Sequence, residues 1–222
     1  NQTSTVTTNF VYDAYGNNIK TIDAETNASY ATYDHFGNRL TYTDANGGVT
    51  TYVYDKDNRL ISVTDAEQHT TAYTYDSVGN RIGVRDANGH TVTYVYDRNN
   101  MLIAVSDPND TDVSLTRSTR YTYDVLGERT SVLDANNHET RYVWREDRRL
   151  VEVISPAVTN AAGQSVQYRT GYAYDAVGQR ITVTDNNGNV SHVVYNQAGL
   201  VRETTDAVGN VTRYTYDANY NQ

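Results

Sequence analysis

The chain has no cysteine, only two prolines and only two phenylalanines among its 222 residues. The absence of cysteine excludes disulfides, thiolate metal sites and cysteine nucleophiles. No run of about 18 apolar residues occurs, so no segment is expected to cross a membrane as a helix. Basic residues are also scarce, since 18 Lys and Arg stand against 27 Asp and Glu, for a net charge of −9. Nucleic acids and anionic membranes bind basic patches, so neither is an expected partner.

What the chain has instead is 21 Tyr and 31 Thr, together with many Val. These residue types favour half-buried, pleated surfaces over helices. The large aliphatic residues that fill the core of a compact domain are few. The composition therefore predicts extended strands joined by many hydrogen bonds, with a tyrosine-rich face.

A Tyr-Asp dipeptide, or a degenerate copy of it, recurs along the whole sequence. Its first residues are Tyr12, Tyr33, Tyr54, Tyr75, Tyr96, Tyr123, Trp144, Tyr174, Tyr195 and Tyr216. Seven of the nine intervals are 21 residues long, and the other two are 27 and 30. We interpret residues 1–222 as a single array of about ten repeats with inserted turns near 107–120 and 155–171. These insertions contain the two prolines, Pro108 and Pro156.

Two further positions recur when the tyrosine is counted as position 0. Position +4 is mostly glycine, which tolerates the positive φ of a tight turn: Gly16, Gly37, Gly79, Gly127, Gly178 and Gly199. Position +11 is aspartate, which can accept backbone N–H groups in a second turn: Asp23, Asp44, Asp65, Asp86, Asp107, Asp134, Asp185 and Asp206. Aliphatic residues at +7 and +9 flank a small or polar +8, the alternation of a strand with one buried face.

Each repeat is thus predicted to be one β-hairpin, and the fold to be all-β. About twenty strands spaced ~4.8 Å apart would make a ribbon on the order of 95 Å wide. Sheets of that width do not stay flat. We therefore expect tandem hairpins of about 21 residues in a curled or spiral antiparallel sheet, an open segment of a shell.

No candidate catalytic, cofactor-binding or metal-binding residue stands out from this pattern. His69, His90 and His138 share position +15, and neighbouring copies lie two strands, roughly 10 Å, apart, too far to share one metal ion. The acidic run Asp107 to Asp112 has oxygen ligands suited to Ca²⁺ but lacks a known calcium-loop spacing, and is interpreted as a solvated loop. The aspartates at positions +1 and +11 recur in most repeats, as turn residues do, and no single copy stands out as a catalytic acid or base. We predict no cofactor and no enzymatic activity.

The repeat, Tyr-Asp-x-x-Gly-Asn-Arg-Ile/Leu-x-x-Val-Thr-Asp-Ala-x-Gly-x-x-Thr-x-Tyr, resembles the YD-repeat (RHS-repeat) family, most clearly over Tyr33–Tyr52, Tyr75–Tyr94 and Tyr174–Tyr195. That family includes bacterial polymorphic and insecticidal toxins and animal teneurins. The resemblance implies a long sheet spiralling into a hollow shell, secreted or at the cell surface. In the toxins the shell encloses a toxic domain, and in teneurins it belongs to an adhesion protein.

Parts of the family pattern are absent, including an Asp-Pro-rich closing cassette and an effector domain after Gln222. Since the chain also starts at Asn1 without Met, we expect an excised segment with partial repeats at its ends. The resemblance implies a non-enzymatic wall whose partners are a toxin cargo or neighbouring repeats of the same parent chain. The alternative is a module that binds a cell-surface glycan or protein through the tyrosine rows or the inserted loops.

Overall fold

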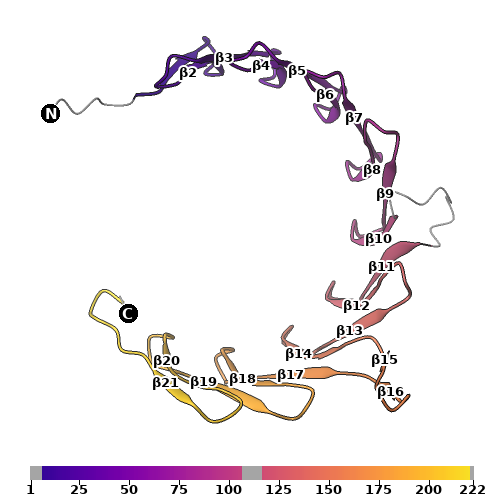
Figure 1. The fold of residues 1–222 in the computed structure, drawn as a ribbon, viewed down its shortest axis with the longest axis vertical. Coiled ribbons are helices and arrows are strands. Elements are labelled where there is room, and N and C mark those ends of the chain that lie inside the picture. Colours follow the sequence, from indigo (N-terminus) through magenta and orange to yellow (C-terminus); the bar gives the residue numbers. More distant parts are fainter. Residues whose placement is uncertain (1–6, 107–116, 221–222) are drawn as a thin grey trace. The chain divides into compact units, whose positions relative to one another are not determined.

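The computed structural model describes residues 7–106 and 117–220, which fall into two compact units, Asn1–Val113 and Ser114–Gln222. All regular elements of the described residues are strands (Figure 1). The described part of the chain contains no helix long and apolar enough to cross a membrane. The prediction of an all-β array of antiparallel hairpins is confirmed in both units.

The first unit is a meander in which each strand pairs antiparallel with the next. Figure 1 shows its strands following one another along a curved ribbon. The strands are β1 (Asn9–Tyr12), β2 (Asn18–Ile22), β3 (Ala28–Tyr33), β4 (Arg39–Thr43), β5 (Val49–Tyr54), β6 (Leu60–Thr64), β7 (Thr70–Tyr75), β8 (Arg81–Arg85), β9 (Thr91–Tyr96) and β10 (Leu102–Ser106).

The second unit is a meander of the same kind with one small hairpin set aside from it. Its main strands are β11 (Ser118–Tyr123), β12 (Arg129–Leu133), β13 (Glu139–Trp144), β14 (Leu150–Ile154), β17 (Arg169–Tyr174), β18 (Arg180–Thr184), β19 (Val190–Tyr195), β20 (Val201–Thr205) and β21 (Val211–Arg213). The small hairpin is β15 (Val158–Thr159) with β16 (Ser165–Val166), and it accounts for the insertion predicted over 155–171. Of the insertion predicted over 107–120, Asp107, Pro108 and the acidic run lie outside the described residues.

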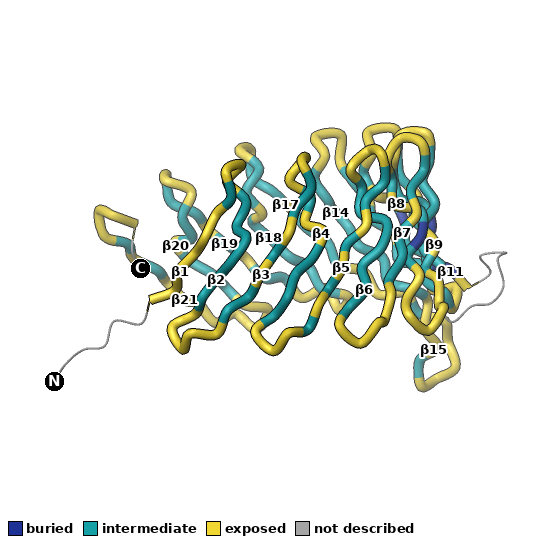
Figure 2. The backbone as a smooth tube through the Cα atoms, turned by 90° about the horizontal axis from the view of Figure 1, so that it is seen from above, coloured by how far each residue is buried: buried dark blue, intermediate teal, exposed yellow. Residues whose placement is uncertain are grey.

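Both units consist of a single layer of sheet. Among the described residues only Gly83, Ala104, Ser118 and Ser131 are buried, and most strand residues are half-buried (Figure 2). Domains normally bury one face of a sheet against a second layer. Here stability must come from contacts between neighbouring strands, which explains why the sequence holds so few large aliphatic residues.

Both turns of a repeat have the same construction. After Tyr12, the N–H of Asp13 donates to the carbonyl of Asn17 and the N–H of Gly16 donates to the carbonyl of Asp13. The carboxylate of Asp13 accepts the N–H groups of Tyr15 and Asn17, each at 2.9 Å. Asp23 repeats these contacts in the second turn. The pattern is that of a three-residue hairpin loop closed by a left-handed residue.

The left-handed residue stands at +4 in the first turn and at +14 in the second. Its φ is positive in every described turn, at 88° for Gly16, 98° for Gly79 and 61° for Asn58. Asparagine is the residue other than glycine that best tolerates this conformation. The six predicted +4 glycines all lie at this position of the first turn.

A β-bulge recurs where each hairpin approaches its first turn. In the β3–β4 pair, Thr32 faces Thr41 but Tyr33 faces Arg39, so Leu40 has no partner of its own. The same shift precedes the tyrosine or tryptophan in the equivalent pairs of both units. A bulge sets two residues of one strand opposite one residue of the other. It therefore interrupts the simple alternation of faces that the sequence suggests.

Candidate functional site

The tyrosine at position 0 connects each repeat to the one before it. The hydroxyl of Tyr75 donates to the carbonyl of Leu60 at 2.8 Å, and Leu60 is the first residue of the preceding hairpin's second strand. Equivalent bonds, at 2.8–3.3 Å, are made by Tyr33, Tyr96, Tyr174, Tyr195 and Tyr216. These hydrogen bonds stabilise the junctions between repeats.

Trp144, which replaces the tyrosine at position 0 in one repeat, makes the equivalent hydrogen bond through its indole N–H. Its indole Nε1–H donates to the carbonyl of Arg129 at 2.8 Å, fifteen residues earlier, as in the tyrosine copies. Indole offers a single N–H donor and no acceptor. Donation alone is what this position requires, so the degenerate copy keeps the contact between repeats.

Arginines at position +6 lie over the tyrosines of one face. The guanidinium of Arg39 lies 5.6 Å from the ring centre of Tyr42 and 5.1 Å from that of Tyr52. Arg81, Arg129 and Arg180 lie over tyrosines at equivalent positions. A cation over an aromatic face is attracted by the ring quadrupole. The bulge places this arginine on the aromatic face, an arrangement that sequence alternation alone did not predict.

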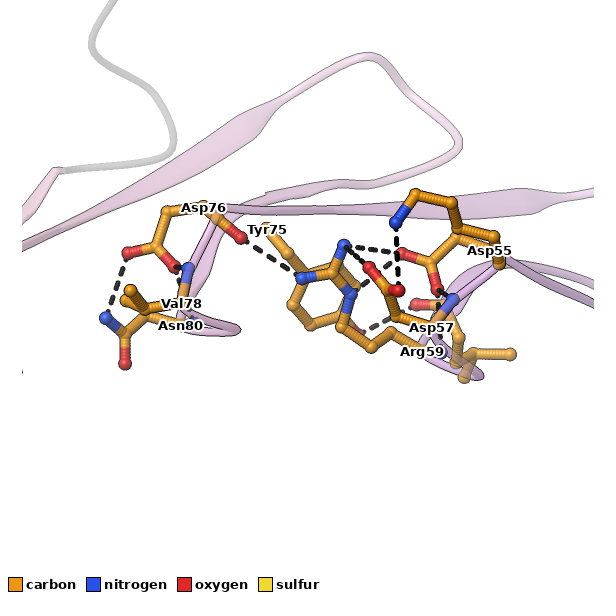
Figure 3. A network of polar contacts seen from close by, with 9 residues as sticks. Asp55, Asp57, Arg59, Tyr75, Asp76, Val78 and Asn80 are labelled. Atoms are coloured by element: carbon orange, nitrogen blue, oxygen red, sulfur yellow. Dashed lines mark hydrogen bonds and ion pairs between the residues drawn. The ribbon is translucent and has the colours of Figure 1, made fainter.

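Arg59 joins two repeats through several contacts at once (Figure 3). Its guanidinium lies 2.7 Å from the Asp55 carboxylate and 3.3 Å from that of Asp57, within its own turn. It also donates to the carbonyl of Asp76 at 3.1 Å and lies 5.1 Å from the ring centre of Tyr75. Figure 3 shows the guanidinium between the two turns, so one side chain fixes the spacing of neighbouring first turns.

The repeats are of two alternating kinds, which we call type A and type B. Type A repeats have Thr or Ala before position 0 and Arg at +6, and begin at Tyr33, Tyr75, Tyr123 and Tyr174. Type B repeats have Val before position 0 and Leu or Val at +6, and begin at Tyr54, Tyr96, Trp144 and Tyr195. The structural period is therefore two repeats, 42 residues where no insertion intervenes.

Side chains bridge each type A repeat to the type B repeat that follows it. The amide of Asn38 donates to the amide oxygen of Asn58 at 2.9 Å, and Asn80 bonds Asn100 in the same way. In the second unit, Arg148 bonds Glu128 at these positions, and Gln179 bonds the carbonyl of Gly199. Both insertions instead follow a type B repeat. The chain is lengthened between A–B pairs and not within them.

Two open recesses lie at equivalent A–B junctions, one in each unit. One has a volume of about 700 Å³ and includes Val78, Gly83, Thr93 and Val95. The other, of about 690 Å³, includes Val177, Thr182, His192 and Val194. Val78 and Val177 stand at position +3 of a type A turn and are 70% and 78% exposed. The residue before position 0 of the type B repeat, Val95 or Val194, contributes the second apolar group.

The carboxylates of both aspartate rows act as turn residues. The side-chain amide and backbone N–H of Asn17 lower the pKa of Asp13 below its usual value. Asn27 and Asn210 lower the pKa of Asp23 and Asp206 in the same way, each side-chain amide having the largest effect. Hydrogen bonds to the charged form favour ionisation. Of the predicted +11 aspartates, Asp23, Asp44, Asp65, Asp86, Asp134, Asp185 and Asp206 lie in second turns, while Asp107 lies outside the described residues.

The histidines at +15 replace the asparagine of other second turns. Nδ1 of His69, His90 and His138 lies 3.1–3.2 Å from the carboxylate of its own turn's aspartate. Asp65, Glu67 and His69 bring three possible metal ligands within 4.8 Å of one another in one exposed turn. Two of these residues, Asp65 and His69, already contact each other within the turn, through the Asp65 carboxylate and Nδ1 of His69. We assign these groups to the turn.

Comparison with known proteins places these features in a family. The model of the RHS repeat matches residues 33–70, 54–91, 75–112, 96–139 and 195–222, together more than half of the chain. A comparison with curated proteins gives no match.

Solved structures resemble the chain in fold. A crystal structure of TcdB2-TccC3-Cdc42 matches with a TM-score of 0.62 at 15% identity, and one of TcdB2-TccC3 with 0.60 at 16%. Each match covers 96% of this chain and 15% of the other. A Photorhabdus luminescens Tc holotoxin pore matches with a TM-score of 0.55 at 17% identity, over 86% of this chain and 13% of that one. This chain thus spans about a seventh of the chains that it resembles.

Proposed function

This chain belongs to the RHS-repeat family, and we propose that it forms part of the wall of a shell that encloses a polypeptide cargo. The observation that carries the proposal is the single-layer sheet, whose described residues leave both faces without a second layer. A layer of this kind gains its stability from strand-to-strand contacts, so it can border a space without a core. The similarity to toxin-complex structures supports the same role through the fold.

The wall would act by exclusion and not by catalysis. Within each unit, a continuous ladder of backbone hydrogen bonds, reinforced by tyrosine hydroxyls between repeats, leaves few openings through which a protease could reach the cargo. The carboxylates and histidines that might act as acids or bases are repeated turn residues. We propose a non-enzymatic role in a secreted or surface-exposed bacterial protein, with a toxin or effector domain as the cargo.

The contacts of the tyrosines argue against a glycan-binding role. Sugar-binding aromatic residues present an open ring face. Here Arg39, Arg81 and Arg129 each lie over two tyrosine rings, and the hydroxyls of other tyrosines donate to carbonyls. The rings therefore already have partners within the sheet.

Protease protection of the intact parent protein tests the proposal. The protein is digested with trypsin under native conditions and after the array is opened with denaturant, and the released peptides are identified by mass spectrometry. We expect peptides from outside the repeat array to appear only after opening. If such peptides are released equally fast from the native protein, or if the parent protein has no polypeptide beyond the array, the proposal is wrong.

A further inference from the structure

The recesses at the A–B junctions form a regular series of apolar groups on an otherwise polar face. The apolar pair Val78 and Val95, which lines one recess, has a counterpart 42 residues earlier, where Phe36 is 64% exposed and Val53 is 48% exposed. In the second unit, the pair Val177 and Val194, which lines the other recess, has a counterpart in the exposed Leu126 and Val143. Each unit therefore carries two exposed apolar pairs at A–B junctions, and a recess is described at one of them.

The junctions between these pairs lack a large apolar residue at the same two positions. Where a type B repeat precedes a type A repeat, the corresponding residues are Asp57 and Thr74, Asp147 and Ala173, or Ala198 and Thr215. Exposed single hydrophobic residues are ordinary on a protein surface. A pair of them at every second junction, with the same backbone positions each time, is a regular feature of this surface.

Successive apolar pairs in a unit are separated by four strands, a distance of about 19 Å at the usual strand spacing. An extended polypeptide covers that distance in roughly six residues, since each residue advances about 3.3 Å. Each recess is open and shallow, so it fits a side chain better than it encloses a small molecule. A polypeptide with apolar side chains about six residues apart therefore matches the series.

The charges around the recesses define the occupant further. The two recesses are lined by Asp76, Asp97 and Asp175 against a single cation, Arg98. The whole chain carries a net charge of −9. Basic residues between the apolar side chains of a bound polypeptide would complement these carboxylates and increase its association rate.

We propose that the recess-bearing face binds an unfolded basic polypeptide, one apolar side chain in each A–B recess. This inference rests on the proposed function, because the enclosed cargo is the polypeptide in question. Each recess alone binds weakly, and linked contacts add by raising the effective concentration of the next side chain. Weak, evenly spaced contacts hold a chain extended along the wall and still allow it to leave.

The test uses synthetic fluorescein-labelled peptides that contain two leucines among lysine, serine and glycine. In one peptide the leucines are six residues apart, and in a second peptide of identical composition they are adjacent. We expect the spaced peptide to bind the purified chain roughly tenfold more tightly in a fluorescence anisotropy titration, by the gain from linked contacts. Equal affinity of the two peptides would overturn the proposal.

Matched variants identify the recesses as the binding sites. Val53→Thr and Val95→Thr together install the residue that type A repeats carry at this position, so the shape of the side chain and the hairpin are preserved. We expect binding of the spaced peptide to weaken roughly fourfold for each recess changed, the contribution of about one buried methyl group. The control, Val208→Thr with Val211→Thr, makes the same change at two exposed valines that line neither recess and is expected to leave binding unchanged.

Two outcomes separate this inference from the proposed function. If trypsin protection of the cargo persists while the valine variants bind the spaced peptide as the wild type does, the wall role stands and the recess proposal is wrong. If sedimentation shows that the chain dimerises and that the valine variants abolish the dimer, the recesses bind a second copy of the chain. That result also overturns the proposal.

Discussion

Replacement of Tyr75 with Phe removes one oxygen atom from a junction between repeats and leaves the aromatic ring in place. The hydroxyl lies 2.8 Å from the half-buried carbonyl of Leu60, so the substitution deletes a short hydrogen bond and leaves an acceptor poorly hydrated. The net value of such a bond is about 1 kcal/mol, and an unsatisfied acceptor can raise the cost to about 2 kcal/mol. Tyr96→Phe is the matched control, since its bond to Arg81 is exposed and 3.3 Å long. Water can replace that donor, and we expect a cost below about 0.5 kcal/mol.

Thermal unfolding followed by circular dichroism measures both variants against the wild type. In repeat arrays the stability is approximately the sum of terms for single repeats and for neighbouring pairs, so the change should appear in the pair term. We expect Tyr75→Phe to lower the thermal midpoint by about 2–8 °C and Tyr96→Phe to lower it by less than half as much. Equal effects of the two substitutions, or no effect of Tyr75→Phe, would refute the assignment of the hydroxyl bonds as the contacts between repeats.

Three further predictions follow from the turns and junctions. Trp144→Tyr should retain a donor for the Arg129 carbonyl and cost less stability than Trp144→Phe, and a reversed order in urea unfolding would contradict the role assigned to the indole N–H. Gly79→Val should destabilise by about 1–2 kcal/mol, because φ is 98° there although a Cβ would meet no atom within 4 Å, whereas Gly79→Asn should cost less in the same assay. Arg145 lowers the pKa of Asp147 to about 2, so the stability that this carboxylate adds is present above its unfolded pKa of about 4 and is lost as the pH falls toward 2. Asp147→Asn should therefore flatten the fall of the melting temperature between pH 4 and 2, and an unchanged slope would show that the ion pair contributes nothing.

The sequence allowed the hairpins and both turns to be predicted because these are local features. Tyr-Asp, the glycine at +4 and the aspartate at +11 each act within five residues of the chain, and their chemistry can be recognised without a structure. Gly16 and Asp23 lie in the turns where the repeat pattern put them. That residues 1–222 form a single array stays a prediction, since the described residues fall into two compact units.

The contacts between repeats were beyond sequence reasoning for a physical reason. The acceptor of the Tyr75 hydroxyl is a backbone carbonyl, which every residue possesses, so no residue type marks Leu60 as the partner. The bulge that turns Arg81 onto the aromatic face is likewise a property of strand register. The alternation of Val95 with Thr74 is visible in the sequence, but a search for one 21-residue consensus averages it away.

The pairing of repeats limits how such an array can change its length over evolutionary time. Unequal recombination that adds or removes 42 residues joins the end of a type B repeat to the start of a type A repeat. The alternation of the two types, and the contacts at every junction, are then preserved. A change of 21 residues would instead set two repeats of the same type side by side, for instance with Arg against Arg at position +6 and without the Asn38–Asn58 type of bridge. Viable descendants should therefore differ from one another by even numbers of hairpins, and the gene would be inherited as a string of double units.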